Sequence, residues 1–250
     1  MSFFNSYKAS EMQIFTEPAP GPYDINFNTP LPEKLETDKI RLVPFVPSIH
    51  AKHFHTVYNQ HPELGTYFPF VWTEYSWFLT MFYAYFHAKP EHLPMIIIDR
   101  TKGNDGDNIE ESMAGMIGYM NSDTHRKSIE IGPVIVFPSW KRTFVSSHAI
   151  GLLMNYAMNL PEEGGLGLRK LVWTFLSGNE ASLKAAQRMG FKVEGTLRWF
   201  WEMPEEVDGE PVDGQRGVGK GKHEVSLSVC WDDWEKEVKE LVHKQMNRQS

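Results

Sequence analysis

The stretch Asn179-Glu-Ala-Ser-Leu-Lys-Ala-Ala-Gln-Arg-Met-Gly-Phe191 decides the fold of this chain. It follows Leu171-Val-Trp-Thr-Phe-Leu176, an apolar run that is typical of a buried strand. Asn179 is a good N-cap, and Gly190 ends the helix that the pattern predicts after it. At such a strand exit, Asn179 and Ser182 can hold a ligand amide and protonate a leaving group. Taken alone, the two residues are better explained by helix capping.

Periodicity around this stretch predicts further strands and helices. The predicted strands are 39–45, 95–100, 112–121, 128–137, 171–176, 192–201 and 224–230, and the predicted helices are 48–59, 74–88, 145–159, 180–189 and 234–248. Residues 102–111 and 202–222 are polar and contain glycine, which predicts loops. A meander of strands followed by alternating strands and helices predicts a mixed α/β sheet in one domain, residues 35–250.

Residues 1–34 contain five prolines, from Pro18 to Pro32, which favour an extended arm. The aromatic residues Phe15, Tyr23 and Phe27 suggest that this arm packs against the domain. A partly disordered tail is an equally good reading of the same composition.

The composition of the 250 residues is that of a globular protein, 41% hydrophobic and 23% charged, with a formal net charge of −7. The negative charge argues against binding to nucleic acid or to an anionic membrane. The single cysteine, Cys230, can form neither an intramolecular disulfide nor a thiolate metal cluster, so we expect no metal. Neither a secretion signal nor a membrane span is recognisable, and we expect a soluble, cytoplasmic protein.

Gly132-Pro133 interrupts the predicted strand 128–137. Because proline donates no hydrogen bond to a neighbouring strand, the pattern predicts a bulge, or a splay from the next strand, at this point. A splayed strand leaves backbone groups free to bind an extended ligand arm. An edge strand with a harmless bulge is the alternative, and periodicity alone favours it.

Trp140-Lys-Arg-Thr-Phe-Val-Ser-Ser-His148 spans a strand-to-helix junction. The free amides at a helix N-terminus attract phosphate groups, and Lys141 and Arg142 add positive charge beside them. Thr143 can both cap the helix and donate a hydrogen bond. A basic, solvated turn with a threonine cap is the alternative.

In combination, these segments resemble the RimJ/RimL branch of the GNAT acetyltransferases. The resemblance covers about residues 35–235, and it depends on the order and spacing of Ile129-Glu-Ile-Gly132, Asn179-Glu-Ala-Ser182, Met189-Gly-Phe-Lys-Val-Glu-Gly-Thr-Leu-Arg198 and Ser226-Leu-Ser-Val-Cys-Trp-Asp-Asp-Trp234. It implies the acyl-CoA N-acyltransferase fold, a central and mostly antiparallel sheet with splayed strands that is flanked by helices. It also implies acetyl-CoA as cosubstrate.

The resemblance further implies which residues bind the cosubstrate. The pantetheine arm would pair with the splayed strand at Val134, Val136 and Phe137, and would meet Asn179. The pyrophosphate would lie on the turn and helix start, formed by Lys141, Arg142, Thr143, Phe144, Val145 and Ser146. Ser182 would protonate the departing thiolate.

The same resemblance implies direct attack of an amine on the acetyl carbonyl, with a backbone amide near Val134 or Val136 stabilising the oxyanion. Glu130 is the candidate for the base that removes a proton from the ammonium, and a purely structural carboxylate is an equal alternative. For the acceptor, Trp77 and Tyr83 of the aromatic helix and His125 of the hairpin are candidate contacts.

Two features depart from the common family pattern. Phe144 and Ser146 replace the small residues that let the backbone approach the pyrophosphate, although one branch of RimL-like proteins also carries Arg-Thr here. Ala185-Ala186-Gln187 occupy the place of a common tyrosine donor, which favours Ser182 in that role.

Three functions therefore remain open at this point. The first is acetyl transfer to a small amine or a protein N-terminus, the second is a binding module of the same fold without turnover, and the third is a same-fold enzyme with another donor or reaction. The sequence does not identify the acceptor, and the closing helix fits either a homodimer or a cap on the sheet.

Overall fold

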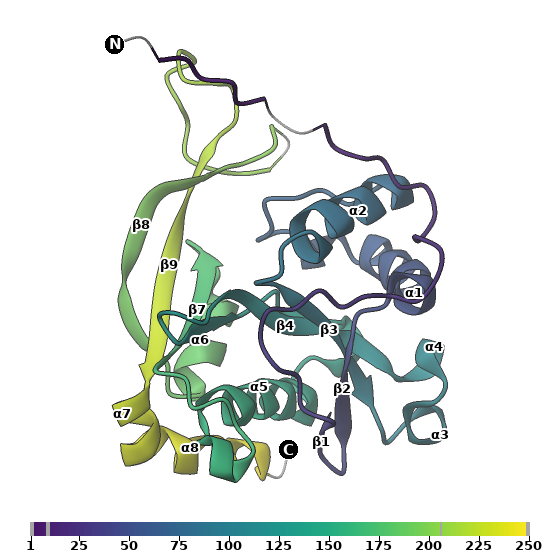
Figure 1. Ribbon diagram of the computed structural model, residues 1–250, viewed down its shortest axis with the longest axis vertical. Coiled ribbons are helices and arrows are strands. Elements are labelled where there is room, and N and C mark those ends of the chain that lie inside the picture. Colours follow the sequence, from purple (N-terminus) through teal and green to yellow (C-terminus); the bar gives the residue numbers. More distant parts are fainter. Residues whose placement is uncertain (1–2, 9–10, 206, 249–250) are drawn as a thin grey trace.

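The computed structural model describes residues 3–8, 11–205 and 207–248, and its centre is one large sheet (Figure 1). Within these residues the strands follow the order β1-β2-β3-β4-β5-β7-β9-β8, and β6 pairs with β4 alone. The strands are β1 (Leu35–Glu36), β2 (Ile40–Pro44), β3 (Leu93–Asp99), β4 (Met113–Asp123), β5 (Ser128–Ile131), β6 (Ile135–Val136), β7 (Lys170–Leu176), β8 (Lys192–Glu202) and β9 (Gly221–Cys230). Every pair is antiparallel except β5 with β7.

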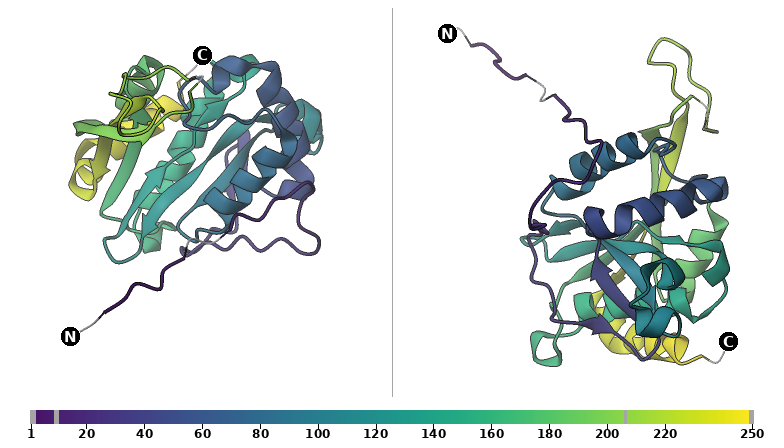
Figure 2. Two further views of the ribbon diagram at one scale, coloured as in Figure 1. Left: turned by 90° about the horizontal axis from the view of Figure 1, so that it is seen from above. Right: turned by 90° about the vertical axis from the view of Figure 1, so that its right-hand side faces the viewer.

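Helices cover both faces of the sheet (Figures 1 and 2). They are α1 (Pro47–Gln60), α2 (Tyr75–Phe82), α3 (Gly103–Gly106), α4 (Ile109–Ser112), α5 (Phe144–Met158), α6 (Glu180–Arg188), α7 (Trp231–Asp233) and α8 (Lys239–Met246), and π-helical turns extend α2 over Tyr83–His87 and join α7 to α8 over Trp234–Val238. Helices α1 and α2 lie on one face, and α5 and α8 lie on the other. None of the helices in the described ranges is long and apolar enough to cross a membrane.

Two hydrophobic cores result, one on each face of the sheet. Successive side chains of a strand point to opposite faces, so Ile97 packs into the core beneath α5 while Ile96 and Ile98 pack into the core beneath α1 and α2. The α1 side is strongly aromatic, and the ring centroids of Phe45 and Phe82 are 4.6 Å apart. The structure is a mostly antiparallel, open sheet flanked by helices, which confirms the predicted fold class.

Three of the differences between the observed elements and the sequence predictions bear on local sequence signals. The predicted strand 128–137 divides into β5 and β6, because Gly132-Pro133 interrupts its pairing. Residues 102–111, predicted as a loop, contain the short helices α3 and α4, and Asn108 caps α4 by accepting a hydrogen bond from the Glu110 amide. The first helix, predicted to begin at residue 48, starts at Pro47, since proline suits the first helical position.

The arm before β1 lies against the helices and the sheet in its described part. The Phe15 ring stacks on Tyr83 at 4.2 Å, and the Phe15 amide donates to Thr80 Oγ1 at 3.0 Å. Further along, the Tyr156 hydroxyl donates to the Pro30 carbonyl at 2.7 Å. These contacts tie residues 15–30 to both α2 and α5.

Strand β8 forms one end of the sheet and pairs only with β9 among the described strands. Nearly all of its residues are exposed, including Val193 and Leu197. Its register slips, so that four steps of β8, from Leu197 to Trp201, span two steps of β9. The slip is a bulge, and at its end Phe200 and Trp201 line a cavity that is shared with Phe70.

We predict that Gly115→Ala destabilises the chain by more than about 1 kcal/mol. Gly115 has a φ of +145°, and a Cβ there would overlap the carbonyl oxygen of Ile135, so β4 and β6 would be forced apart. Gly195→Ala on β8 is the matched control, because nothing lies within 4 Å of its Cβ position. Urea unfolding should separate the two variants, and equal midpoints would contradict this account.

Candidate functional site

The sheet forks between β5 and β7. The two strands pair in parallel from Ser128 to Glu130, and Glu130 lies opposite Val172. After this point β6 pairs with β4, while β7 continues alongside β9 to Leu176. The Gly132-Pro133 peptide bond lies in the gap and is cis. The expected splay is therefore present at the expected residues.

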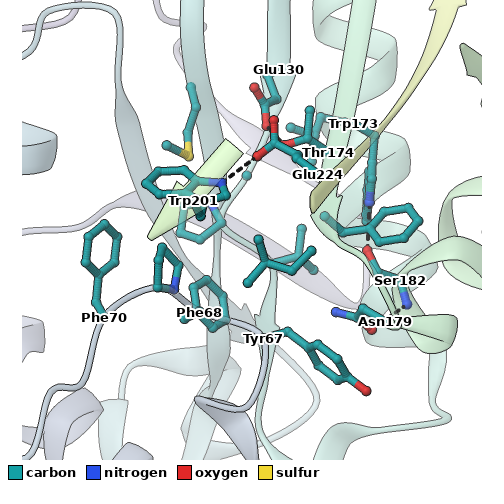
Figure 3. Close-up of a pocket in the computed structure, with 18 of the residues that line it drawn as sticks. Tyr67, Phe68, Phe70, Glu130, Trp173, Thr174, Asn179, Ser182, Trp201 and Glu224 are labelled. Carbon is teal, nitrogen blue, oxygen red and sulfur yellow. Dashed lines mark hydrogen bonds between the residues drawn. The ribbon is translucent and has the colours of Figure 1, made fainter. Parts of the chain in front are cut away.

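A cavity of about 290 Å³ occupies the fork and the space above it (Figure 3). Residues from the α1–α2 connection, β5, β7, β8, β9 and the start of α6 form its wall. Aromatic side chains make up much of that wall, and they are Tyr67, Phe68, Phe70, Trp72, Tyr85, Phe86, Trp173, Phe175, Phe200 and Trp201. Its polar side chains are Asn121, Glu130, Thr174, Asn179, Ser182 and Glu224.

Asn179 and Ser182 meet at one end of this cavity. The Asn179 side chain accepts a hydrogen bond from the Ser182 amide at 3.0 Å, which is the predicted N-cap of α6. The Trp173 indole donates to Ser182 Oγ at 2.9 Å. An indole N–H can only donate, so the Ser182 hydroxyl acts as acceptor in this bond and keeps its own hydrogen as a donor.

Glu130 lies on the cavity wall with both carboxylate oxygens hydrogen-bonded. Oε1 accepts from the Thr174 hydroxyl at 2.6 Å, and Oε2 accepts from the Asn121 amide at 2.8 Å. Both hydrogen bonds hold the Glu130 carboxyl in a fixed orientation beside the cavity.

A second carboxylate, Glu224 of β9, faces the same cavity and was not among the sequence candidates. Its Oε2 accepts a hydrogen bond from the Trp201 indole at 2.9 Å. Burial raises the pKa of the Glu224 carboxyl above its ordinary 4.5, and the charge of Glu130 raises it further, whereas hydrogen bonds from Trp201 and Thr174 lower it. The sequence contains one signal for Glu224. Polar residues alternate along its strand, at Glu224, Ser226 and Ser228, and a polar face on a strand inside the sheet indicates a polar site.

Tyr85, in the π-helical turn after α2, is a further polar group that lines the cavity. Burial raises the pKa of its phenol to about 12, and the charges of Glu130 and Glu224 contribute to the rise. The phenol therefore stays protonated at neutral pH. Its ring contacts Phe70 edge-on, at 5.0 Å between centroids.

The turn before α5 is exposed and basic. Thr143 caps α5 by accepting a hydrogen bond from the Val145 amide at 3.3 Å. Lys141 and Arg142 are exposed, and neither forms an ion pair with any residue that the structure describes. Phe144 packs its ring against His148 at 5.7 Å, beneath the Lys39 ammonium.

The three strand residues predicted to bind the pantetheine arm differ in how accessible they are to a ligand. Val134 lines the cavity. Val136 is half-buried and packs on the α5-side core. Phe137 is buried against Phe54, and its amide already donates to the Ala114 carbonyl at 2.8 Å, which leaves little of this residue for a ligand.

The three predicted acceptor contacts do not line the cavity. Trp77 is on α2 and is 42% exposed. Tyr83 is buried beneath the arm, where its hydroxyl accepts from the Ala19 amide at 2.8 Å. His125 is exposed at the tip of the β4–β5 hairpin. The aromatic residues that do line the cavity come mainly from residues 67–72 and from the end of β8.

Comparison with known proteins gives a family and a fold. The model of the acetyltransferase (GNAT) domain matches residues 39–192, and no curated protein matches the chain. A GCN5-related N-acetyltransferase from Brucella melitensis is similar over 86% of both chains, with 21% identity and a TM-score of 0.66. A probable acetyltransferase (GNAT family) from Chromobacterium violaceum ATCC 12472 is similar over 90% of this chain and 100% of that chain, again with 21% identity and a TM-score of 0.66.

A third similar structure is the spermidine N-acetyltransferase from Vibrio cholerae in complex with CoA and spermine. It is similar over 80% of this chain and 100% of that chain, with 11% identity and a TM-score of 0.56. At these identities, all three structures show a shared fold.

We predict that Glu224→Gln raises the melting temperature at pH 7 by more than it does at pH 4. Because burial raises the pKa of Glu224, its contribution to stability is complete below its ordinary pKa and is lost as the pH rises through the folded-state value. The ionised carboxylate therefore costs stability at pH 7. Glutamine removes that cost and still accepts from Trp201.

Glu194→Gln is the control, because the pKa of Glu194 is shifted in the opposite direction from that of Glu224. A hydrogen bond from Lys170 lowers the pKa of Glu194, so its contribution is present above its ordinary pKa and is lost on acidification. This variant should melt below the wild type at pH 7, with a difference that fades at pH 4. Thermal scans at both pH values test the pair, and parallel pH dependences would contradict the assignment.

Proposed function

The chain belongs to the GNAT acetyltransferase family, and on that premise we propose that it transfers the acetyl group of acetyl-CoA to a primary amine by direct attack in a ternary complex. One observation carries the proposal. The cavity brings Asn179 and Ser182, beside the fork, together with the carboxylates Glu130 and Glu224. An aromatic wall with two carboxylates suits an ammonium group attached to an apolar body.

The donor side of the proposal rests on the fork and on the turn before α5. Beyond Glu130, β5 and β6 have no pairing with β7, and Val134, which lines the cavity, has no partner residue on β7. An extended pantetheine arm can pair with such groups. The start of α5, with Lys141 and Arg142, offers the amides and positive charge that a pyrophosphate requires.

Phe144 and Ser146 remain compatible with this role. The Phe144 ring packs on His148 and Lys39, so its bulk lies along the body of α5 rather than at the cap residue Thr143. Ser146 is half-buried in the first turn of the helix. This arrangement favours a cosubstrate-binding enzyme over a module that has lost the site.

Ser182 is the proposed proton donor to the departing thiolate. Trp173 donates to Ser182 Oγ, and the described residues include no acceptor for the Ser182 hydroxyl hydrogen, which is therefore available for donation. On the acceptor side, the ammonium must lose a proton before its nitrogen can attack, and Glu130 is the proposed base. A backbone amide near Val134 would stabilise the charge that develops on the carbonyl oxygen.

Within the family we place the chain in a RimJ/RimL-like branch, on the motifs of residues 129–132, 179–182 and 189–198. The acceptor is then a small-molecule amine or a protein N-terminus. The aromatic wall favours an acceptor with an apolar group near the amine. Use of acetyl-CoA favours a cytoplasmic location.

Calorimetry with acetyl-CoA, followed by an amine panel, tests the proposed function. The panel contains 2-phenylethylamine, butylamine and the dipeptide Ala-Phe, and release of free CoA thiol reports turnover. We expect saturable binding and thiol release with at least one amine. Absence of heat and of a thermal shift at millimolar acetyl-CoA would overturn the proposal, and binding without thiol release would favour a binding module.

We predict that the double variant Lys141→Ala, Arg142→Ala binds acetyl-CoA at least about tenfold more weakly, a loss of about 1.4 kcal/mol or more. The reason is loss of two cations beside the pyrophosphate, so the difference should shrink as salt rises. Lys236→Ala removes an exposed cation from the C-terminal helical segment and should bind as the wild type does. Equal affinities of the double variant and this control would rule out the turn as the phosphate site.

A further inference from the structure

Two separate hydrogen bonds hold Ser182 at the cavity wall (Figure 3). Its backbone amide donates to the Asn179 side chain at 3.0 Å, which fixes the start of α6. Its side-chain oxygen accepts from the Trp173 indole of β7 at 2.9 Å. The first bond fixes the position of the residue in the helix, and only the second acts on the direction of its side chain.

Packing holds the Trp173 indole in one place. Trp173 is 2% exposed and belongs to the core beneath α5. Its ring meets the ring of Phe191, just after α6, edge-on, with 5.5 Å between the centroids. On the sheet it is in register with Leu227 of β9. Because a close-packed interior leaves such a ring little freedom, its N–H is a fixed donor.

A serine side chain has more freedom, and in helices it usually has a competing partner. Its oxygen can occupy three staggered positions, and its hydrogen rotates about the C–O bond. Serine and threonine hydroxyls in helices often donate to the carbonyl three or four residues earlier. Here Ser147 of α5 donates to the Phe144 carbonyl at 3.0 Å, and Thr56 of α1 donates to the Lys52 carbonyl at 2.8 Å. A hydroxyl bonded in this way is not available to a ligand.

Ser182 forms no such bond with any residue in the described ranges. The carbonyl four residues before it is that of Gly178, and it accepts from the Tyr67 hydroxyl at 3.1 Å and from the Glu180 amide at 3.0 Å. Since a carbonyl oxygen has two lone pairs, none is left for Ser182. The surroundings therefore stabilise the rotamer in which the Ser182 oxygen meets the indole of Trp173.

We propose that Trp173 is a positioning residue for acetyl transfer, whose indole N–H sets the rotamer of Ser182 and keeps the Ser182 hydroxyl hydrogen available to the sulfur of the cosubstrate. The inference rests on the proposed function. As the C–S bond breaks, its electron pair goes to sulfur, and the Ser182 proton converts the thiolate into a thiol. The Ser182 oxygen regains a proton from the attacking nitrogen, which must lose one to become an amide.

The test removes the indole donor and keeps an aromatic ring in its place. With acetyl-CoA and the amine of the panel that turns over fastest, we expect Trp173→Phe to lower kcat at least about tenfold. The KM for acetyl-CoA should stay within about twofold, because the bond matters when the thiolate departs.

Trp234→Phe is the matched control. Trp234 is also buried, and its indole donates to the Asn159 side chain at 3.2 Å, but it is not among the residues that line the cavity. We expect this variant to keep kcat within about twofold of the wild type. A Trp234→Phe enzyme as impaired as Trp173→Phe would overturn the inference, because any lost indole bond would then have the same effect.

A double-mutant cycle separates positioning from packing. Ser182→Ala removes the hydroxyl on which Trp173 acts, so adding Trp173→Phe to it should lower kcat by no more than about twofold further. The same loss in both backgrounds would show that Trp173 acts through packing and would overturn the inference. So would a Trp173→Phe enzyme with wild-type kcat.

Indole N–H resonances test the contact without turnover. In isotopically labelled protein, the Trp173 resonance is assigned by its loss in Trp173→Phe. We expect CoA to move it further downfield than desulfo-CoA does, because a hydroxyl that donates to sulfur becomes a stronger acceptor. In Ser182→Ala, the two ligands should give the same shift.

The inference and the proposed function fail by different measurements. Equal shifts from CoA and desulfo-CoA in the wild type, when calorimetry shows that both bind, would overturn the role of Trp173 and leave acetyl transfer standing. Absence of acetyl-CoA binding in calorimetry would overturn the proposed function itself.

Discussion

The site depends on the early end of the parallel pairing between β5 and β7. Only three residue pairs, Ser128 to Glu130 on β5, join the two strands. Pro133 has no amide hydrogen to continue the ladder, and β6 turns to β4 instead. Backbone groups that lose a strand partner in the interior require another partner. The fork therefore leaves a gap in the sheet, and this gap is where the proposed function places the pantetheine arm.

The electrostatics of the cavity follow from which strands border the fork. Strand β9 lies beside β7, so its polar face brings Glu224 toward Glu130 of β5. The residues that line the described cavity include no lysine or arginine. Burial in this aromatic enclosure raises the pKa of the Glu224 carboxyl. The cationic acceptor of the proposed function would lower the cost of keeping Glu224 ionised.

The sequence was sufficient for the fold, because the patterns around residues 128–137 and 171–191 are local. The N-cap Asn179 and the interruption at Gly132-Pro133 act within a few residues, and the structure has both. The cavity wall was harder to predict. Glu224 faces Glu130 only because β9, last in the chain among the strands, inserts between β7 and β8. The aromatic helix suggested Trp77 and Tyr83 as acceptor contacts. In the folded chain Trp77 is partly exposed to solvent, and the N-terminal arm covers Tyr83.

The slipped register at the end of β8 has a second consequence, for the chain's tendency to aggregate. A long edge strand presents unpaired backbone groups that can recruit a strand from another molecule. Along β8 the charged residues Lys192, Glu194, Arg198 and Glu202 are spaced among the apolar ones, and the bulge before Trp201 breaks the regular row of donors and acceptors. The distortion that brings Trp201 to the cavity thus also makes this edge a poor template for fibrils.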